Sequence, residues 1–243
     1  MACRVLPLLL AVLLSACAVL APSAVDPQAG SRVTCGGGPA FSIDLLAAAG
    51  SAETAADRAA EALRRHLATD NIEINDLPDD GWIEVARSGS EVLYLAPVPA
   101  SEGSWHFVTV DLDGGTWDVA GWGGCALQPD VGPLLGIASF RVAPGAEPGP
   151  DATEIDVLVT ERACNSGEDA RGRIVAPAVV LGEERVVVTF AVRPRGGDQT
   201  CPSNPETPFV LELPEPLGDR ALFDGSSVPP RDATVCPDIA ACP

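Results

Sequence analysis

Lysine is missing from this sequence, and histidine and aromatic residues are scarce. All 15 basic residues are Arg, the two His are His66 and His106, and Trp, Tyr and Phe make up 5% of the 243 residues. Chemistry that needs a Schiff-base or P-loop lysine is therefore excluded. Positive charge is also scarce, because 34 Asp and Glu against 15 Arg give a formal net charge of −19. We expect no nucleic-acid partner, since phosphate binding needs a basic patch, and neither a cofactor nor a bound metal.

Long hydrophobic runs are lacking too. The N-terminal apolar run, 5–14, covers ten residues behind Arg4, and no other segment approaches the length that spans a bilayer. A positive residue followed by a short apolar run is typical of a signal peptide, which we place at 1–16.

The four residues that follow the run, Leu14-Ser15-Ala16-Cys17, carry a further signal. They resemble the lipobox of bacterial lipoproteins, in which an aliphatic and two small residues precede a cysteine. The resemblance implies that Cys17 carries a diacylglycerol and becomes the first mature residue, at the outer face of the cytoplasmic membrane. Residues 17–32 would then be the lipidated Cys and a flexible tether, of which the fourteen residues 18–31 extend about 45 Å. The alternative is plain secretion, with cleavage after a small residue such as Ala24.

Six cysteines remain after Cys3 leaves with the signal peptide and Cys17 takes the lipid. An even number in an exported chain indicates disulfides. We expect the pairs that stay within one domain or tail: Cys35–Cys125, Cys164–Cys201 and Cys236–Cys242. A zinc site is the less favoured alternative, because no C-x-x-C is present and neither His lies at ligand spacing.

Hydrophobic periodicity predicts one strong helix, over 52–68, with Ala and Leu on one face. After it the period changes to two, and strands are expected at 82–87, 91–97, 104–112 and 116–122. One helix on an antiparallel meander makes a small α+β domain, which we place at 33–130.

No helical pattern follows the Pro- and Gly-rich segment 128–133. Alternating residues predict strands at 135–142, 154–160, 172–181, 184–192 and 208–213. Short strands with Pro and Gly turns favour an all-β, sandwich-like domain over 131–227. Residues 228–243 are expected to form a Pro/Cys-rich tail that runs over the surface.

The segment from Glu161-Arg162-Ala163-Cys164 to Pro216-Leu217-Gly218-Asp219-Arg220 resembles uncharacterised exported proteins of high-GC Gram-positive bacteria. The all-Arg, Ala/Gly/Pro-rich composition fits that source. The resemblance implies an actinobacterial-like exported protein and adds no chemistry.

Catalytic signatures are weak. No G-x-S-x-G pentapeptide is present; we expect His66 to be solvated on the helix and His106 to be a hydrogen-bonded structural residue. The acidic run between Asp70 and Asp80 is interpreted as a solvated loop rather than a Ca²⁺ site. Arg141, Arg162 and Arg220 are candidates for binding an anion, but each has acidic neighbours, and none is preferred.

All four Trp fall in the first domain: Trp82, Trp105, Trp117 and Trp122. Such a set can line a ligand pocket for an apolar group or a sugar ring. The alternative, which we favour, is that they fill a core whose helix offers mainly Ala.

These patterns together predict a lipid-anchored extracytoplasmic binding or interaction protein of unknown ligand, and a non-enzymatic role. Its expected partners are the membrane, through the lipid anchor, and a protein or cell-wall component. Two alternatives stay open. One is a secreted hydrolase that uses two carboxylates facing each other in a cleft. The other is a structural surface protein with no specific ligand.

Overall fold

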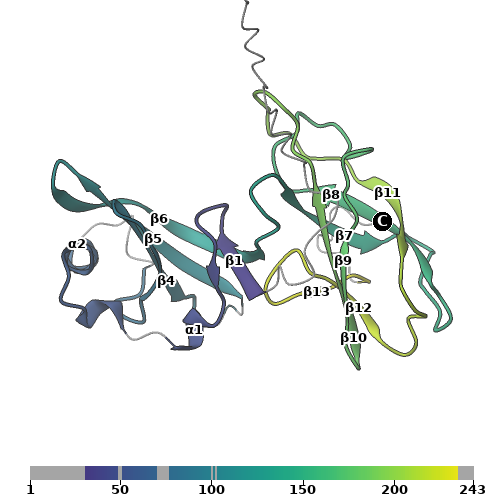
Figure 1. Cartoon of the computed structure of the whole chain (residues 1–243), viewed down its shortest axis with the longest axis horizontal. Helices are drawn as coiled ribbons and strands as arrows, with labels where there is room; N and C mark the ends of the chain where they lie inside the picture. The colour runs from purple at the N-terminus through teal and green to yellow at the C-terminus, as the bar shows by residue number, and fades with distance from the viewer. Residues whose placement is uncertain (1–30, 49–50, 70–76, 100, 102, 235–243) are drawn as a thin grey trace, which may run out of the picture.

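The protein is built mainly from two β-sheets that follow one another along the chain (Figure 1). A computed structural model describes residues 31–48, 51–69, 77–99, 101 and 103–234. The signal peptide, Cys17 and the tether up to residue 30, and the predicted Cys236–Cys242 pair, lie outside the described residues. Two α-helices and one 3₁₀ turn accompany the first sheet.

The first sheet has six antiparallel strands in the order β2-β1-β6-β5-β4-β3. Their bounds are β1 Arg32–Cys35, β2 Phe41–Ser42, β3 Ile83–Arg87, β4 Glu91–Pro97, β5 Ser104–Asp113 and β6 Thr116–Pro129. The four predicted strands form the meander β3 to β6. Sequence reasoning missed β1 and β2 and ended β6 too early, because Gly121, Gly123 and Gly124 interrupt its apolar pattern.

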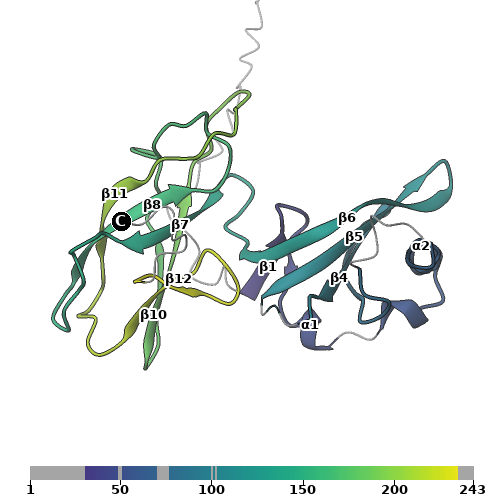
Figure 2. The same ribbon diagram turned by 180° about the vertical axis from the view of Figure 1, so that it is seen from behind.

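Both faces of this sheet are covered, which explains the continuous apolar run in β4. Val92, Tyr94 and Ala96 pack on the side of α2 (Arg58–Leu67), whereas Leu93 and Leu95 pack on the opposite side. α2 lies over β5 and β6 (Figure 2). The opposite face is covered by the β1–β2 segment and by α1 (Leu45–Ala48).

The main helix is shorter than its apolar pattern predicts. Residues Ala52–Thr54 form the 3₁₀ turn η2, and Asp57 then caps α2 by accepting hydrogen bonds from the backbone N–H groups of Ala59 and Ala60. Because the N-cap residue has an extended backbone, the helix cannot include the residues before it. The result is one main helix on an antiparallel meander, an α+β arrangement.

The second sheet has seven strands in the order β11-β8-β7-β10-β12-β13, with β9 paired to β10. Their bounds are β7 Gly136–Val142, β8 Glu154–Glu161, β9 Ala178–Leu181, β10 Arg185–Val192, β11 Thr207–Glu212, β12 Ala221–Asp224 and β13 Arg231–Asp232. The first half of β10 pairs with β9 and, in parallel, with β12, and its second half pairs with β7. The strands thus enclose one apolar core, which includes Phe140, Val157, Phe190 and Leu211. This half is all-β and sandwich-like.

Two expectations for the second half need correction. The strand predicted over 172–181 begins at Ala178, with Ile174 making only an isolated bridge to Val192. Residues 228–234 do not run over the surface as a tail, because β13 completes the sheet and buries Ala233 in the core. The Pro residues around β13 hid this two-residue strand from sequence reasoning.

Both predicted disulfides within the described residues are present. Cys35–Cys125, with Cα atoms 5.7 Å apart, joins β1 to β6. Cys164–Cys201, with Cα atoms 4.6 Å apart, joins the segment after β8 to the segment before β11. Each bond therefore closes within one half of the chain.

The two halves contact each other at a second place besides the linker between β6 and β7. The β12–β13 loop lies against the first sheet, where the Val228 N–H donates to the Leu127 carbonyl at 3.0 Å. Val228 packs into the apolar cluster of the first half, and Pro229 lies beside Gly103. In Figure 1 this yellow loop reaches from the second half toward β1.

Candidate functional site

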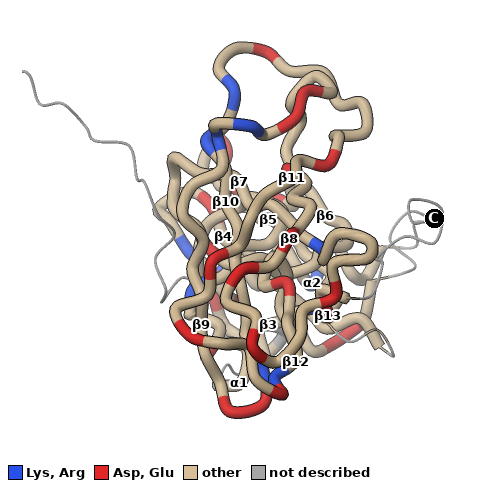
Figure 3. The backbone as a smooth tube through the Cα atoms, turned by 90° about the vertical axis from the view of Figure 1, so that its right-hand side faces the viewer, with Lys and Arg blue, Asp and Glu red and all other residues tan. Residues whose placement is uncertain are grey.

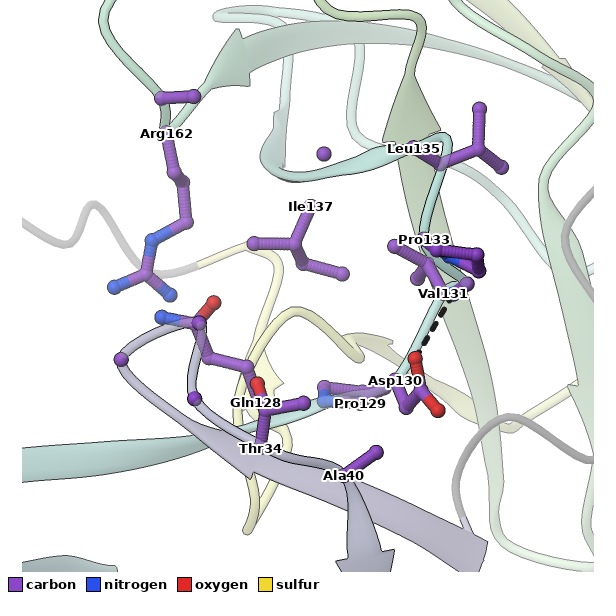
Figure 4. A pocket seen from close by; sticks show the side chains of 16 residues that line it. Thr34, Ala40, Gln128, Pro129, Asp130, Val131, Pro133, Leu135, Ile137 and Arg162 are labelled. Carbon is purple, nitrogen blue, oxygen red and sulfur yellow. Dashed lines mark hydrogen bonds between the residues drawn. The ribbon is translucent and has the colours of Figure 1, made fainter. Parts of the chain in front are cut away.

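The candidate site is a hollow of about 720 Å³ at the junction of the two halves (Figure 4). Four segments line it: the β1–β2 turn, the linker from β6 to β7, the start of β7 and the residues just after β8. The side chains that matter below are Thr34, Gln128, Asp130, Val131, Leu135, Ile137 and Arg162. A hollow of this size accommodates a small organic ligand.

One wall of the hollow is apolar. Val131 and Pro133 belong to the linker, and Leu135 and Ile137 follow at the start of β7. Leu135 also packs against Val175, Ala178 and Ala191 of the second half, which holds this wall in place. Figure 4 shows Val131, Pro133 and Leu135 grouped on one side, with Ile137 between them and Arg162.

The floor of the hollow includes a glycine turn. Gly36 and Gly37 have φ values of +61° and +83°, a left-handed conformation that favours glycine. A Cβ atom added at either position would meet nothing within 4 Å, so the turn borders open space. Thr34 and Gln128 lie directly opposite each other in the β1–β6 ladder. Neighbouring side chains on one face of an antiparallel pair lie about 5 Å apart, and both line the hollow.

Arg162 forms the cationic end of the hollow. It follows Glu161, whose buried carboxylate accepts hydrogen bonds from Arg173 Nη2 at 2.6 Å and Asn165 Nδ2 at 3.0 Å. These bonds fix the end of β8, and the next residue, Arg162, lines the hollow. Figure 4 shows its guanidinium and the side-chain amide of Gln128 pointing toward one another.

The three Arg residues that the sequence offered as candidates for binding an anion differ in their ion pairing. Arg141 makes a bidentate pair with Glu206 at 2.7 and 2.8 Å. Arg220 pairs with Glu215 at 2.7 Å. Within the part of the chain that the structure describes, Arg162 has no carboxylate within 4.0 Å. Its charge is therefore available to a ligand, whereas the charges of Arg141 and Arg220 are already matched.

Arg162 is exposed, and the protein holds its guanidinium only weakly. Its Nη1 reaches one neutral acceptor, the Ser226 carbonyl, at 3.4 Å. Partial burial of the guanidinium and the positive charge of Arg231 lower the pKa of Arg162, and the attraction of Asp224 opposes them. Asp224 already has partners, because it binds Arg231 at 2.8 Å and Ser226 Oγ at 2.8 Å.

The hollow also has one carboxylate, Asp130, in the linker. It accepts a hydrogen bond from the Gly132 N–H at 3.0 Å and lies 3.4 Å from Arg32 Nε. Figure 4 places Asp130 and Arg162 on different sides of the hollow. The acid therefore orders the linker turn and does not pair with Arg162.

The structure does not bring the four Trp residues together around this hollow. Trp82 is fully buried and Trp117 packs on the same side, under α2. Trp105 packs with the cluster on the opposite face of the sheet. Trp122 is 36% exposed, and its ring lies 4.8 Å from that of His66. Three of the four therefore contribute to two separate apolar clusters, and none lines the hollow.

The histidines differ from expectation in one respect. His66 is not simply solvated, because its Nε2 is buried, has no hydrogen-bond partner among the described residues, and its ring packs on Trp122. Burial lowers the pKa of His66. His106 is half-buried in β5, opposite Ala96. Neither His lines the hollow.

Acidic residues are spread over the strands and loops seen in Figure 3. Among the described residues no three His, Cys, Asp or Glu side chains gather closely enough to hold a metal ion. Most of the acidic run after α2, residues 70–76, lies outside the described part. No helix in the described ranges is long and apolar enough to cross a membrane.

Comparison with protein-family models, with curated proteins and with solved structures finds no match for this chain. The hollow itself was missed by sequence reasoning. Its only sequence signals are the Gly36-Gly37-Gly38 run and the Pro-rich segment 129–133, which indicate turns and do not say that the turns meet.

Proposed function

We propose that this protein is a lipid-anchored binding protein at the outer face of the cytoplasmic membrane, and that the hollow between its two halves is the ligand site. The observation that carries the binding role is a hollow of about 720 Å³ with one apolar wall and one unpaired cation. Pockets that bind small molecules combine such walls with a few polar groups.

The two disulfides support the compartment. Cys35–Cys125 and Cys164–Cys201 indicate an oxidising, extracytoplasmic environment. The lipid anchor rests on the lipobox-like residues that end in Cys17. Two acyl chains hold a protein stably at a membrane where one chain is marginal. A strongly acidic body has no other electrostatic means of staying on an anionic lipid surface.

The hydrolase alternative finds less support in the hollow. A glycan hydrolase needs two facing carboxylates, roughly 5 to 10 Å apart. The lining holds a single carboxylate, Asp130, and this group is occupied by Arg32 and the Gly132 N–H. A purely structural surface protein needs no hollow and no cation within it.

The anchor is tested by expressing the chain in its own host beside a Cys17→Ser variant. We expect a diacyl mass increment and membrane retention for the parent chain, and the loss of both in the variant. Unmodified parent protein in the medium would mean plain secretion and would remove the anchor from the proposal.

The binding role is tested separately by a ¹⁹F NMR screen of fluorinated fragments against the full chain in lipid nanodiscs, with empty nanodiscs as the blank. Ala163 is exposed and lines the hollow, so Ala163→Trp should block it. Exposed Glu147 follows the far end of β7, and Glu147→Trp is the matched control. We expect fragment binding that Ala163→Trp abolishes and Glu147→Trp preserves. If every fragment signal survives Ala163→Trp, the hollow is not the ligand site.

A further inference from the structure

The two sides of the hollow differ in character. Arg162 stands on one side with the amide of Gln128, and Val131, Pro133 and Leu135 form the other (Figure 4). From this arrangement we infer that the ligand is a small organic carboxylate with an apolar body, held by Arg162 at its charged end. This inference rests on the proposed role of the hollow as a ligand site.

The sign of the ligand charge follows from the pairing of the lining residues. Arg162 has no carboxylate within 4.0 Å among the described residues, and its hydrogen bond to the neutral Ser226 carbonyl is long, at 3.4 Å. Asp130, the carboxylate of the lining, is already bound by Arg32 and the Gly132 N–H. A cationic ligand would have to compete with Arg32 for Asp130 and would be repelled by Arg162. An anion instead supplies the partner that Arg162 lacks.

A carboxylate fits this end better than a phosphate. A guanidinium presents two parallel N–H donors that match the two oxygens of one carboxylate. Gln128 lies next to this end, and Thr34 is its opposite residue in the β1–β6 ladder; neither side chain makes a hydrogen bond to a described residue. A phosphate dianion carries twice the charge, which one Arg in a chain of net charge −19 does not balance.

The apolar wall indicates the chemistry of the rest of the ligand. Half-buried Val131 and exposed Pro133 offer apolar surface to a ligand, and Leu135 and Ile137, each only 9% exposed, support them from the core. Each buried CH₂ group of a ligand contributes about 0.8 kcal/mol to binding. An alkyl or similar apolar body therefore gains from the wall, while the carboxylate orients the molecule toward Arg162.

The test uses ¹⁹F NMR titration of 8,8,8-trifluorooctanoate against the full chain in lipid nanodiscs, with empty nanodiscs subtracted. The neutral probe 8,8,8-trifluorooctanol has the same apolar body. We expect the carboxylate to bind the parent chain more tightly than the alcohol. Arg162→Met should weaken carboxylate binding by about tenfold to a hundredfold, which is the range for a hydrogen bond to a charged group. Binding of the alcohol should not change, which also shows that the variant is folded.

Two further variants make the result specific. Arg171 is 78% exposed and does not line the hollow, so Arg171→Met removes one positive charge elsewhere and should leave both affinities unchanged. Gln128→Met should weaken carboxylate binding less than Arg162→Met does, because it removes a neutral donor.

The outcomes separate this inference from the proposed function. If octanoate and octanol derivatives bind equally and Arg162→Met affects neither, the hollow is an apolar site and the carboxylate inference is wrong, while the binding role stands. The carboxylate inference is also wrong, and the binding role stands, if the octanoate does not bind while Ala163→Trp abolishes the binding of other fragments. Displacement of the octanoate by an equal concentration of inorganic phosphate would replace a carboxylate site with a general anion site.

Discussion

At the scale of single residues, a charged group can bind a ligand only where it has no ion-pair partner in the folded chain. Arg141, Arg162 and Arg220 look alike in the sequence, each with acids nearby. In the folded chain Glu206 pairs with Arg141, and Glu215 pairs with Arg220. Neither of these two acids pairs with Arg162. Glu161, next to Arg162 along the chain, is turned inward and bound by Arg173. The nearest acid in sequence is therefore not a partner in space.

The clearest residue-scale prediction concerns Asp57, the N-cap of α2. Its Oδ1 accepts from the N–H groups of Ala59 and Ala60 at 2.9 and 3.2 Å and lies 3.3 Å from Arg87. Replacing it with Ala should lower the free energy of unfolding by about 1 kcal/mol, the usual value of a cap. Chemical denaturation of the two proteins at neutral pH measures the difference.

The same residue makes a pH-dependent contribution. Burial alone raises the pKa of Asp57, but the hydrogen bonds from Ala60 and Ala59 and the charge of Arg87 outweigh it, so the folded-state pKa lies below 3.8. The carboxylate therefore stabilises the fold above its unfolded pKa, and this contribution is lost as the pH falls through the folded pKa. Asn keeps the cap but does not titrate, so the stability advantage of the parent over Asp57→Asn should shrink on acidification. An advantage that is independent of pH would contradict this assignment.

At the scale of secondary-structure elements, the two disulfides fasten short or irregular segments to long strands. Cys35 ends the four-residue β1 and is bonded to Cys125 of β6, across 90 residues of chain. Cys164 and Cys201 close a segment of 37 residues that includes β9 and β10. β1 is only four residues long, although it pairs with both β2 and β6, and the segment just after β8 is not part of a strand.

Loss of either disulfide should therefore destabilise the fold. Restricting the unfolded chain by loops of this length contributes about 4 kcal/mol. We expect the paired variants Cys35→Ala/Cys125→Ala and Cys164→Ala/Cys201→Ala to unfold at lower denaturant concentration than the parent chain. A reductant breaks both bonds at once, so the reduced parent chain should unfold at a lower denaturant concentration than either paired variant without reductant. An unchanged denaturation midpoint for Cys164→Ala/Cys201→Ala would mean that the segment around Arg162 is held by its hydrogen bonds alone.

At the scale of the whole molecule, the described residues of the two halves meet at the linker of 130–135 and at the β12–β13 loop. Val228 bridges to Leu127, and Pro229 lies against Gly103. The hollow lies beside these contacts, so its shape depends on how the halves sit against each other.

Gly103→Ala tests the second contact. A Cβ at this position would lie 2.6 Å from Pro229 Cδ and 3.1 Å from the Val228 carbonyl oxygen. Gly145 is a matched control, because its φ of +75° equals that of Gly103, +76°, within a degree, and an added Cβ would meet nothing within 4 Å. Beyond the shared backbone cost, Gly103→Ala should lose a further 1 to 3 kcal/mol, roughly the cost of overpacking. Equal losses in the two variants, measured by thermal unfolding, would show that the loop moves away freely.

Local patterns in the sequence predicted most of the strands and the existence of α2, and they favoured, without fixing, the pairing of the two described disulfides. These features depend on residues that are close in the sequence or in the same domain. Examples are the alternation along a strand, the Ala and Leu face of a helix, and the confinement of a cysteine pair to one half. The short strands β1, β2, β12 and β13 were not predicted, since segments of two to four residues show no recognisable period. The hollow could not be predicted from local patterns, because its lining comes from four segments between Thr34 and Ala163 that meet when the two halves dock. The tertiary structure also decided which Arg stays unpaired, because ion pairing depends on distance in space and not on spacing along the chain.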